Sequence, residues 1–212
     1  MPNGKILFLW YPRRIKKISL MESKQTKLLI TDFDGTLVNT FKANFLAYQK
    51  AFSEVGLLLT EKDYHKYFGF RFDLFMNKMN IKDKSIQIKI KQLKSQYYPE
   101  YFKFLEINYS LLEFIKSFKR SGGYTAIAST AARKNLENAL SYIKAKDTFH
   151  YILAGEEVNQ GKPSPEIYLN VLKHFNVRPD EALVFEDSEV GIQSAQAAGI
   201  NYIVINSLFY GN

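Results

Sequence analysis

The chain has 212 residues, of which 46% are hydrophobic and 24% are charged. This length and composition indicate a folded protein with one α/β core and room for a small inserted module, and they exclude a disordered chain. The absence of cysteine excludes disulfides and cysteine-based metal sites or nucleophiles, and it fits a reducing, cytoplasmic setting. No run of about 18 apolar residues occurs, so we expect no membrane span.

The net charge of +8 raises the question of a nucleic-acid partner, but the basic excess is unevenly distributed. Residues 1–20 contain no acid and supply five of these charges, from Lys5, Arg13, Arg14, Lys16 and Lys17. We interpret residues 1–26 as a basic N-terminal extension, either a surface or membrane-contacting arm or the product of a start codon placed ahead of Met21. No nucleic-acid motif occurs, and we expect neither a nucleic-acid nor a membrane partner.

The first predicted element is a buried strand in the apolar run at residues 27–33, which ends in acids and is followed by Gly35. Residues 41–56 then place apolar side chains at spacings of three and four, which predicts an amphipathic helix closed by Gly56.

Residues 60–118 carry further helical patterns and no clear strand. Thr60 is followed by acids, as at a helix start. Another helix is predicted at 81–98 and stopped by Pro99, and the next at 109–118. A helical block therefore separates the first predicted strand from the second.

After this block, strands alternate with helices, which predicts a parallel sheet with right-handed crossovers and helices on both faces. The predicted strands are 124–128, 151–154, 182–185 and 202–205, and the predicted helices are 133–145, 165–175 and 190–198.

Polar side chains follow several of these strands. The first strand ends at Asp32 and Asp34, the second at Ser129 and Thr130, and the fourth at Glu186 and Asp187, while Lys162 lies between the third and the fourth. Because ligands of open parallel sheets bind beyond the carboxyl ends of the strands, we expect these side chains to meet at one edge.

Asp32 and Asp34 are two residues apart, so an extended backbone points both carboxylates to one side. Such carboxylates repel unless a cation or a shared proton relieves them, and Asp187 adds a third. Oxygen ligands of this kind suit Mg²⁺, which would neutralise charge on a phosphoryl group. One carboxylate can then attack phosphorus while the other transfers a proton.

Four segments carry a resemblance to a known family. Residues 32–38 (Asp-Phe-Asp-Gly-Thr-Leu-Val) resemble the first signature of the haloacid dehalogenase superfamily, and Ser129 after an apolar strand resembles the second. Residues 161–168 (Gly-Lys-Pro-Ser-Pro-Glu-Ile-Tyr) resemble the third, and 185–199, with Glu-Asp-Ser and Ala-Ala-Gly, resemble the fourth. The resemblance spans about residues 27–206 and is specific, because the four motifs occur in order.

The resemblance implies a doubly wound, Rossmann-like α/β core at residues 27–40 and 119–212, with a helical cap at 41–118 inserted after the first strand. In this family the cap closes over the site and selects the substrate. The most similar branch holds β-phosphoglucomutase and the sugar-phosphate and phosphoglycolate phosphatases. The implied protein hydrolyses a small phosphorylated metabolite as a monomer or weak homodimer.

By this resemblance, Asp32 would be the nucleophile and a metal ligand. Asp34 would be the acid/base, with its backbone carbonyl also on the metal. Asp187 would bind Mg²⁺, and Glu186 would assist there directly or through water. Taken without the family, Asp32 and Asp34 also suit a turn and helix cap.

The remaining roles concern the phosphoryl group and the substrate. Ser129 and Lys162 would hydrogen-bond the phosphoryl group, with Thr130 as a rival for the place of Ser129. Arg71, in the cap, would clamp a phosphate or carboxylate of the substrate, although a solvated arginine is an equally good interpretation. Asn44 occupies the position at which the mutases carry a histidine, and we expect both Asn44 and Thr130 to contact the substrate.

Three functions remain open on this sequence. Asp34 favours phosphoryl transfer over dehalogenation, since the dehalogenases lack an acid there. Asn44 favours a phosphatase over the alternative of a phosphomutase or other phosphotransferase. A non-catalytic binding module on the same fold is the third possibility, and the intact Asp32, Asp34 and Lys162 oppose it.

Overall fold

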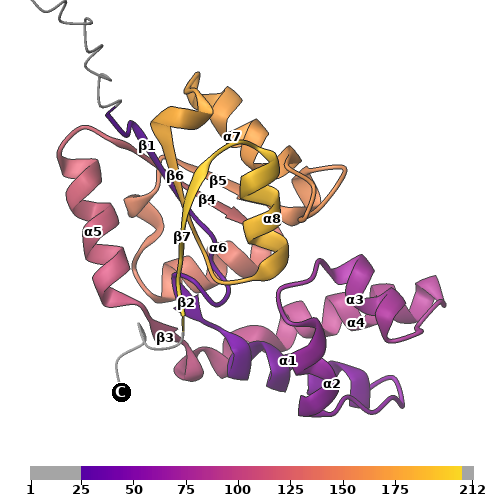
Figure 1. The fold of residues 1–212 in the computed structure, drawn as a ribbon. Coiled ribbons are helices and arrows are strands. Elements are labelled where there is room, and N and C mark those ends of the chain that lie inside the picture. Colours follow the sequence, from indigo (N-terminus) through magenta and orange to yellow (C-terminus); the bar gives the residue numbers. More distant parts are fainter. Residues whose placement is uncertain (1–24, 207–212) are drawn as a thin grey trace, which may run out of the picture.

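The computed structural model describes residues 25–206, and almost all of the predicted basic extension lies outside the described residues. Five parallel strands form one sheet in the order β5-β4-β1-β6-β7 (Figure 1). The strands are β1 (Leu28–Thr31), β4 (Tyr124–Ser129), β5 (Tyr151–Ala154), β6 (Ala182–Glu186) and β7 (Asn201–Val204). Their order puts β1, which leads into the first acidic motif, in the middle.

Helices cover both faces of this sheet, which confirms the predicted doubly wound fold. On one face Leu29 packs with residues of α5 and α6, and on the other Leu28 and Ile30 pack with residues of α7 and α8. This alternation follows from the two-residue period of a strand. The four helices are α5 (Tyr109–Arg120), α6 (Arg133–Tyr142), α7 (Glu166–Phe175) and α8 (Glu189–Ala197), and the short 3₁₀ segments between elements are η2 (Lys146–Thr148), η3 (Gly155–Glu157) and η4 (Pro179–Glu181).

The inserted cap lies to one side of the sheet, beyond the carboxyl end of β1 (Figure 1). It has its own apolar interior, in which the fully buried Phe52 lies near the rings of Tyr48 and Phe75. Side chains define two of its helix starts, since Thr60 accepts a hydrogen bond from Asp63 N and Asp83 accepts one from Ile86 N. Its helices are α1 (Phe41–Ser53), α2 (Glu61–Tyr67), α3 (Phe72–Lys78) and α4 (Lys84–Tyr97), followed by η1 (Tyr98–Phe104).

The two chain crossings between core and cap pair with each other as a short antiparallel ribbon. It consists of β2 (Val38–Asn39) and β3 (Glu106–Ile107), and Asn39 Nδ2 donates to Glu106 Oε2 over 2.8 Å. The sequence predicted no strand between 60 and 118. Two residues are too few to show a strand period, so the pattern of β3 was undetectable.

The packing of α5 bears on where the cap ends. The sequence placed residues 41–118 in the cap, and α5 packs against the sheet, next to β4, where its buried Leu112 and Ile115 share a cluster with Phe33 of the core. The sequence grouped α5 with the cap because it follows other helices without an intervening strand signal. We therefore propose that the cap ends between η1 and β3.

Three predicted helices also have different bounds. The helix predicted at 81–98 begins only at Lys84, where Asp83 caps it, and Pro99 lies in the first turn of η1 and therefore diverts the chain into a 3₁₀ helix. The helix predicted at 41–56 ends at Ser53, and the one predicted at 133–145 ends at Tyr142.

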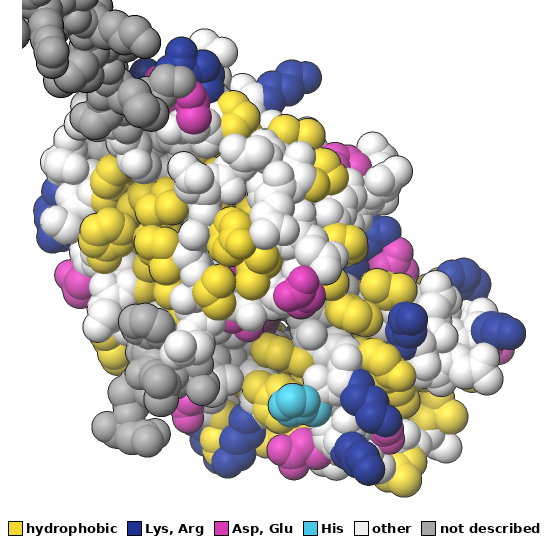
Figure 2. Space-filling model, viewed as in Figure 1, with side chains coloured by type: hydrophobic (Ala, Val, Ile, Leu, Met, Phe, Trp, Pro, Cys, Tyr) yellow, Lys and Arg dark blue, Asp and Glu magenta, His cyan; other side chains and the backbone are white. Residues whose placement is uncertain are grey.

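Some apolar surface stays exposed on the edge strand β7 and on α5, at Ile203, Val204 and Phe114. Figure 2 shows hydrophobic side chains gathered over this part of the core. Among residues 25–206, no helix has both the length and the apolar character that a membrane crossing requires.

We expect Phe52→Ala to destabilise the protein by about 3–5 kcal/mol, because it removes a fully buried ring and leaves a cavity in the cap interior. Urea unfolding followed by circular dichroism measures the change. The control is Leu58→Ala, whose side chain is 79% exposed and which should change stability by less than about 0.5 kcal/mol. Equal effects of the two substitutions would contradict the packed cap interior.

Candidate active site

Lys162 joins the ends of three strands through one buried ammonium group. Its Nζ donates to Asp32 Oδ1 over 2.6 Å, to Ala128 O over 3.0 Å and to Glu186 Oε1. These acceptors follow or end β1, β4 and β6 respectively. The lysine comes from the loop before α7, so the sequence expectation that separate segments meet at one edge holds for this group.

Charge and burial oppose each other at this cluster. Burial disfavours the charge on Lys162, but the carboxylates of Asp32 and Glu186 outweigh it and hold the pKa of the lysine above its usual range. Burial raises the pKa of Asp32, with Lys162 opposing and Glu186 and Asp187 adding to the rise. The lysine is therefore charged at neutral pH, and it supplies only part of the positive charge that these acids require.

Glu186 is fully buried, and hydrogen bonds engage both of its carboxylate oxygens. Besides Lys162, Oε1 accepts a bond from Tyr168 Oη over 2.9 Å. Oε2 accepts bonds from the backbone N–H groups of Asp187 and Ser188 and from Ser188 Oγ, at 3.0–3.1 Å. This carboxylate is fixed in place, and Tyr168 was not predicted to be one of its partners.

Asp187 completes an acidic group with Asp32 and Glu186. Each offers a carboxylate oxygen, and these oxygens lie within 4.8 Å of one another. Asp187 Oδ1 accepts a hydrogen bond from Thr36 Oγ1 over 2.7 Å, and burial raises the pKa of Asp187 to about 6 despite that bond. Three carboxylates against one ammonium leave two negative charges, so the donor set and its charge fit one hard divalent cation.

Two glycines make room for these acids. A methyl group on Gly35, whose φ is 93°, would overlap the carboxylate of Asp187, and one on Gly191 would overlap that of Glu186. The sequence motifs contain glycine at both places because any larger side chain would displace an acid of the cluster.

Asp34 does not belong to the acidic group through its side chain. Oδ1 accepts hydrogen bonds from Thr40 Oγ1 and from Asn44 Nδ2, the latter over 3.0 Å, and Oδ2 accepts one from Ser129 Oγ over 3.4 Å. The predicted Asp34, Asn44 and Ser129 are thus brought together. Thr40 was missed, although its position before α1 marked it as a potential cap. Its hydroxyl bonds Asp34 and makes no cap.

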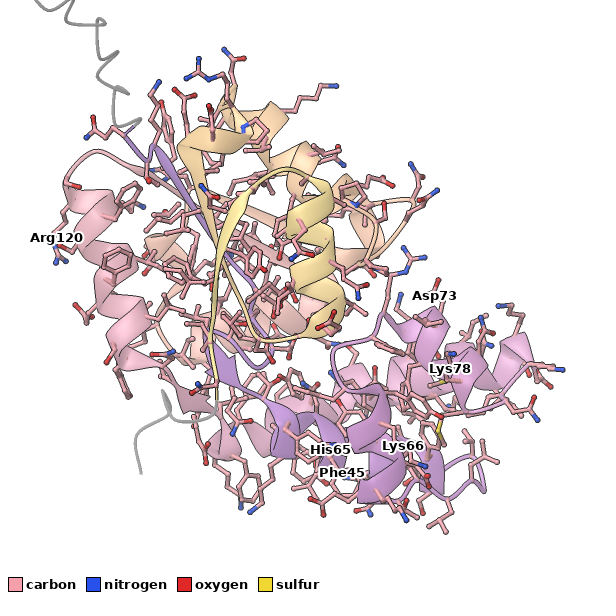
Figure 3. The ribbon with its side chains drawn as sticks, viewed as in Figure 1. Phe45, His65, Lys66, Asp73, Lys78 and Arg120 are labelled. Carbon is pink, nitrogen blue, oxygen red and sulfur yellow. The ribbon has the colours of Figure 1, made fainter. Side chains whose placement is uncertain are left out.

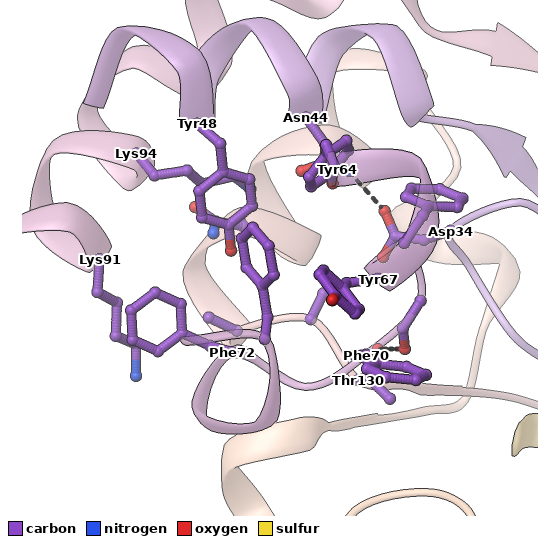
Figure 4. A pocket seen from close by; sticks show the side chains of 16 residues that line it. Asp34, Asn44, Tyr48, Tyr64, Tyr67, Phe70, Phe72, Lys91, Lys94 and Thr130 are labelled. Carbon is purple, nitrogen blue, oxygen red and sulfur yellow. Dashed lines mark hydrogen bonds between the residues drawn. The ribbon is translucent and has the colours of Figure 1, made fainter. Parts of the chain in front are cut away.

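A pocket opens between cap and core beside Asp34 (Figure 4). Tyrosines of α1 and α2 and two lysines of α4 line its cap side, and Thr130 lies on its core side. Several aromatic residues of the cap face this pocket. Residues lining it include Asn44, Tyr48, Tyr64, Tyr67, Phe70 and Phe72.

Lys94 is the buried cation of this pocket, and only 5% of its surface is exposed. Its Nζ lies 3.7 Å from the ring centroid of Tyr98 and 5.2 Å from that of Tyr48. Burial lowers the pKa of Lys94 to about 7, with the charge of Asp34 opposing. The sequence did not distinguish Lys94, because α4 is rich in lysine and its other lysines are solvated.

Arg71 and Thr130 fasten the cap to the core. Arg71 Nη1 donates to the carbonyls of Val158 and Asn159 over 3.2 and 3.3 Å, and its guanidinium also pairs with Asp73. Thr130 Oγ1 donates to Gly69 O over 3.1 Å. In Figure 3, Asp73 lies on the side of α3 that faces the core. Arg71 therefore contacts the core in this structure, and its role as a substrate clamp stays a prediction.

Comparison with known proteins gives the family. The sequence matches the haloacid dehalogenase-like hydrolases over residues 29–205, so the chain belongs to that family. A phosphorylated carbohydrates phosphatase of Thermotoga maritima is 31% identical over 188 residues, which are 85% of this chain and 86% of the relative. Protein CbbY of Rhodobacter capsulatus is 32% identical over 196 residues, 86% of each protein.

The fold is also similar to solved structures of this family. The crystal structure of CbbY from Rhodobacter sphaeroides in complex with phosphate has a TM-score of 0.79 at 24% identity, and the match covers 87% of this chain and 88% of that one. The predicted family and fold are confirmed. With its relatives, this chain is a phosphatase of the family, a phosphoric monoester hydrolase.

Gly191→Ala should displace Glu186, because the new methyl group overlaps a carboxylate that is fixed by its other contacts. We expect at least a tenfold loss of kcat/KM and about 1–3 kcal/mol of destabilisation, measured by phosphate release and urea unfolding. Gln193→Ala, on the exposed face of α8, is the control and should retain both properties. Full activity of Gly191→Ala would show that Glu186 need not stay in place.

Lys94→Met should stabilise the protein in a pH-dependent way. The lysine has a pKa of about 7 when folded and an ordinary value of 10.5, so the unfolded chain binds the extra proton between these values. The cost of the buried charge is therefore full below about pH 7 and fades as the pH rises toward 10.5. We expect the free energy of unfolding of the variant to exceed that of the native protein by a few kcal/mol at about pH 6 and by much less at about pH 9.5.

Denaturant unfolding of both proteins at these two pH values measures the difference. Lys91→Met, at an exposed lysine of the same helix, is the control and should show no such trend. A stability gain that is the same at both pH values would mean that Lys94 is not forced to carry its charge in a buried site.

Proposed function

We propose that this protein is a Mg²⁺-dependent phosphatase of a small phosphorylated metabolite, a sugar phosphate or a similar compound, and that Asp32 carries the phosphoryl group as an aspartyl phosphate. The observation that carries the proposal is the convergence of Asp32, Lys162 and Asp187 at the carboxyl ends of β1 and β6. The named activity of the Thermotoga maritima relative supports the substrate class.

Asp32, Asp187 and Glu186 are the residues that would hold the metal, with Glu186 acting directly or through water. When bound, Mg²⁺ offsets the charge of the phosphoryl group and so lets a carboxylate approach it. Burial, with the charge of Glu186 adding to it, raises the pKa values of Asp32 and Asp187, and a bound cation would offset both effects, which supports this role.

The chain's own residues account for the proton and bond changes in two steps. In the first, an oxygen of Asp32 bonds to phosphorus while the bond to the leaving oxygen breaks, and Asp34 gives that oxygen a proton. In the second, Asp34 takes a proton from water, whose oxygen bonds to phosphorus and releases phosphate from Asp32. Lys162 and Ser129 would hold the phosphoryl oxygens through both steps.

The contacts of Asp34 support its role in proton transfer. Thr40 and Asn44 of the cap side and Ser129 of the core hold its carboxylate at the pocket, apart from the acidic group. Asn44 also bears on the mutase alternative. Its amide donates to Asp34 but does not exchange protons as an imidazole does, so it offers no second proton carrier at that position.

The deciding experiment is a hydrolysis screen of phosphorylated metabolites with Mg²⁺, comparing the native protein with Asp32→Asn. We expect phosphate release from at least one sugar phosphate, and a loss of about 10³-fold or more in the variant, because an amide is a poor nucleophile. Activity that survives in Asp32→Asn would remove Asp32 from the role of nucleophile.

Metal dependence gives a matched measurement on the same assay. Chelation should abolish turnover and added Mg²⁺ should restore it, whereas Asp187→Asn should raise the Mg²⁺ concentration needed for half-maximal activity by about tenfold or more. Asp73→Asn, at an acid outside the cluster, should not change that concentration. Full activity in the presence of chelator would contradict the metal assignment.

A further inference from the structure

The segment between β5 and α7, residues 155–165, carries Lys162 and also contacts the cap. Arg71, the residue before α3 of the cap, donates from Nη1 to three carbonyl oxygens of this segment over 3.2–3.5 Å. These are the carbonyls of Gly155, Val158 and Asn159. One arginine of the cap therefore binds the stretch of backbone that leads to the buried lysine.

The core holds the same segment from its other side. Glu166, the first residue of α7, accepts hydrogen bonds from the backbone N–H groups of Asn159 and Gln160 over 2.7 and 2.8 Å. At Asn159 the core thus binds the N–H group while the cap binds the carbonyl. Hydrogen bonds to an ionised group are among the stronger ones, so both contribute to the conformation of the segment. The segment is fully held only while cap and core are in contact.

The contact with Arg71 extends to the residue next to Lys162. Gly161 lies against the arginine side chain, since a methyl group on this glycine would come within 3.2 Å of Arg71 Cδ. Lys162 follows directly, and its side chain is only 1% exposed. The packing of Arg71 therefore bears on the peptide that leads into the lysine.

Asp73 orients the guanidinium of Arg71 from within the cap. Arg71 Nε donates to Asp73 Oδ1 over 2.8 Å, and Nη2 donates to Asp73 Oδ2 over 2.5 Å. A guanidinium is planar, so this two-point pair fixes the direction of Nη1, which binds the 155–165 segment. The arginine joins the cap and the core with a defined geometry.

We propose that Arg71 is a positioning residue that couples closure of the cap to the placement of Lys162. With the cap closed, Arg71 fixes the carbonyls of the 155–165 segment and Lys162 lies at Asp32. With the cap open, the segment keeps only its core contacts, and Lys162 is held less firmly. This inference rests on the proposed function, because it takes Lys162 as a residue that holds the phosphoryl group.

A second contact between the cap and the same segment provides the matched control. Lys91 of α4 pairs with Glu156 over 3.2 Å, and both side chains are about half exposed. Exposed ion pairs of this kind contribute little to stability. Glu156→Gln therefore breaks an ion pair between the cap and the 155–165 segment and leaves the carbonyls that Arg71 binds untouched.

Hydrogen–deuterium exchange, measured by mass spectrometry, tests the coupling without using activity. In Arg71→Ala we expect the backbone amides of the 155–165 segment to exchange at least about tenfold faster than in the native protein, because local opening costs less once the cap contact is lost. Peptides from β1 and β4 should exchange at the native rate. In Glu156→Gln the segment should change by less than about threefold.

Kinetics test whether the loosened segment acts through Lys162. The substrates are p-nitrophenyl phosphate and the metabolite hydrolysed fastest in the screen, each with Mg²⁺. We expect Arg71→Ala to lower kcat by about tenfold on both, since Lys162 acts on the phosphoryl group that they share. Arg71→Lys should recover part of this loss, because it keeps a cation that can donate to the carbonyls. Glu156→Gln should keep the native kcat within about twofold.

The outcomes separate this role from others. A substrate clamp predicts instead a rise of KM that is confined to the metabolite, and that result would overturn the inference. Native exchange of the 155–165 segment in Arg71→Ala would overturn it too, as would faster exchange throughout β1 and β4, which reports a general loss of stability. An equal effect of Glu156→Gln would show that any contact with the cap serves as well, and so would also overturn it.

Each of these failures leaves the phosphatase assignment intact. The proposed function fails on a different observation, the absence of hydrolysis by the native protein with Mg²⁺ present. In that case the exchange measurement still decides whether Arg71 holds the 155–165 segment.

Discussion

The buried contact of Lys162 with Asp32 and Glu186 is the interaction on which the site depends. Carboxylates at the ends of β1 and β6 lie close enough to repel each other, and a cation from a third segment is needed before the strands can present them together. Much of the surrounding structure follows from this arrangement. Tyr168 and the start of α8 fix Glu186, and Gly191 leaves it space.

Asp34 connects the two parts of the molecule. Its position two residues after Asp32 ties it to the core, yet two of its three side-chain partners, Thr40 and Asn44, lie at the start of the cap. The third, Ser129, ends β4. The group proposed for proton transfer is therefore held by residues of both cap and core, so its orientation depends on the position of the cap relative to the core. The contacts of Arg71 and Thr130 between cap and core help to set that position.

Sequence patterns located the core of the site because its residues follow directly on apolar strands. Asp32, Lys162 and Asp187 lie in short segments whose spacing is fixed by the backbone, and they meet in space as expected. Lys94 was not predicted, because its position does not follow from a short segment of the sequence. Its burial depends on rings from α1 and η1, and nothing in a lysine-rich helix distinguishes the one lysine that turns inward. The contacts of Arg71 with the core could not be predicted, because its acceptors are backbone carbonyls, which every sequence contains.

The ribbon of β2 and β3 has a consequence for how the cap can move. Because the two crossings are bonded to each other at Val38 and Ile107, they cannot bend independently. Two tethers joined side by side act as a single hinge, which permits rotation about one axis and resists twisting or sliding. We expect a cap mounted in this way to keep one position over Asp34 whenever it is closed, which would limit the entropy lost in re-forming the pocket around each substrate molecule.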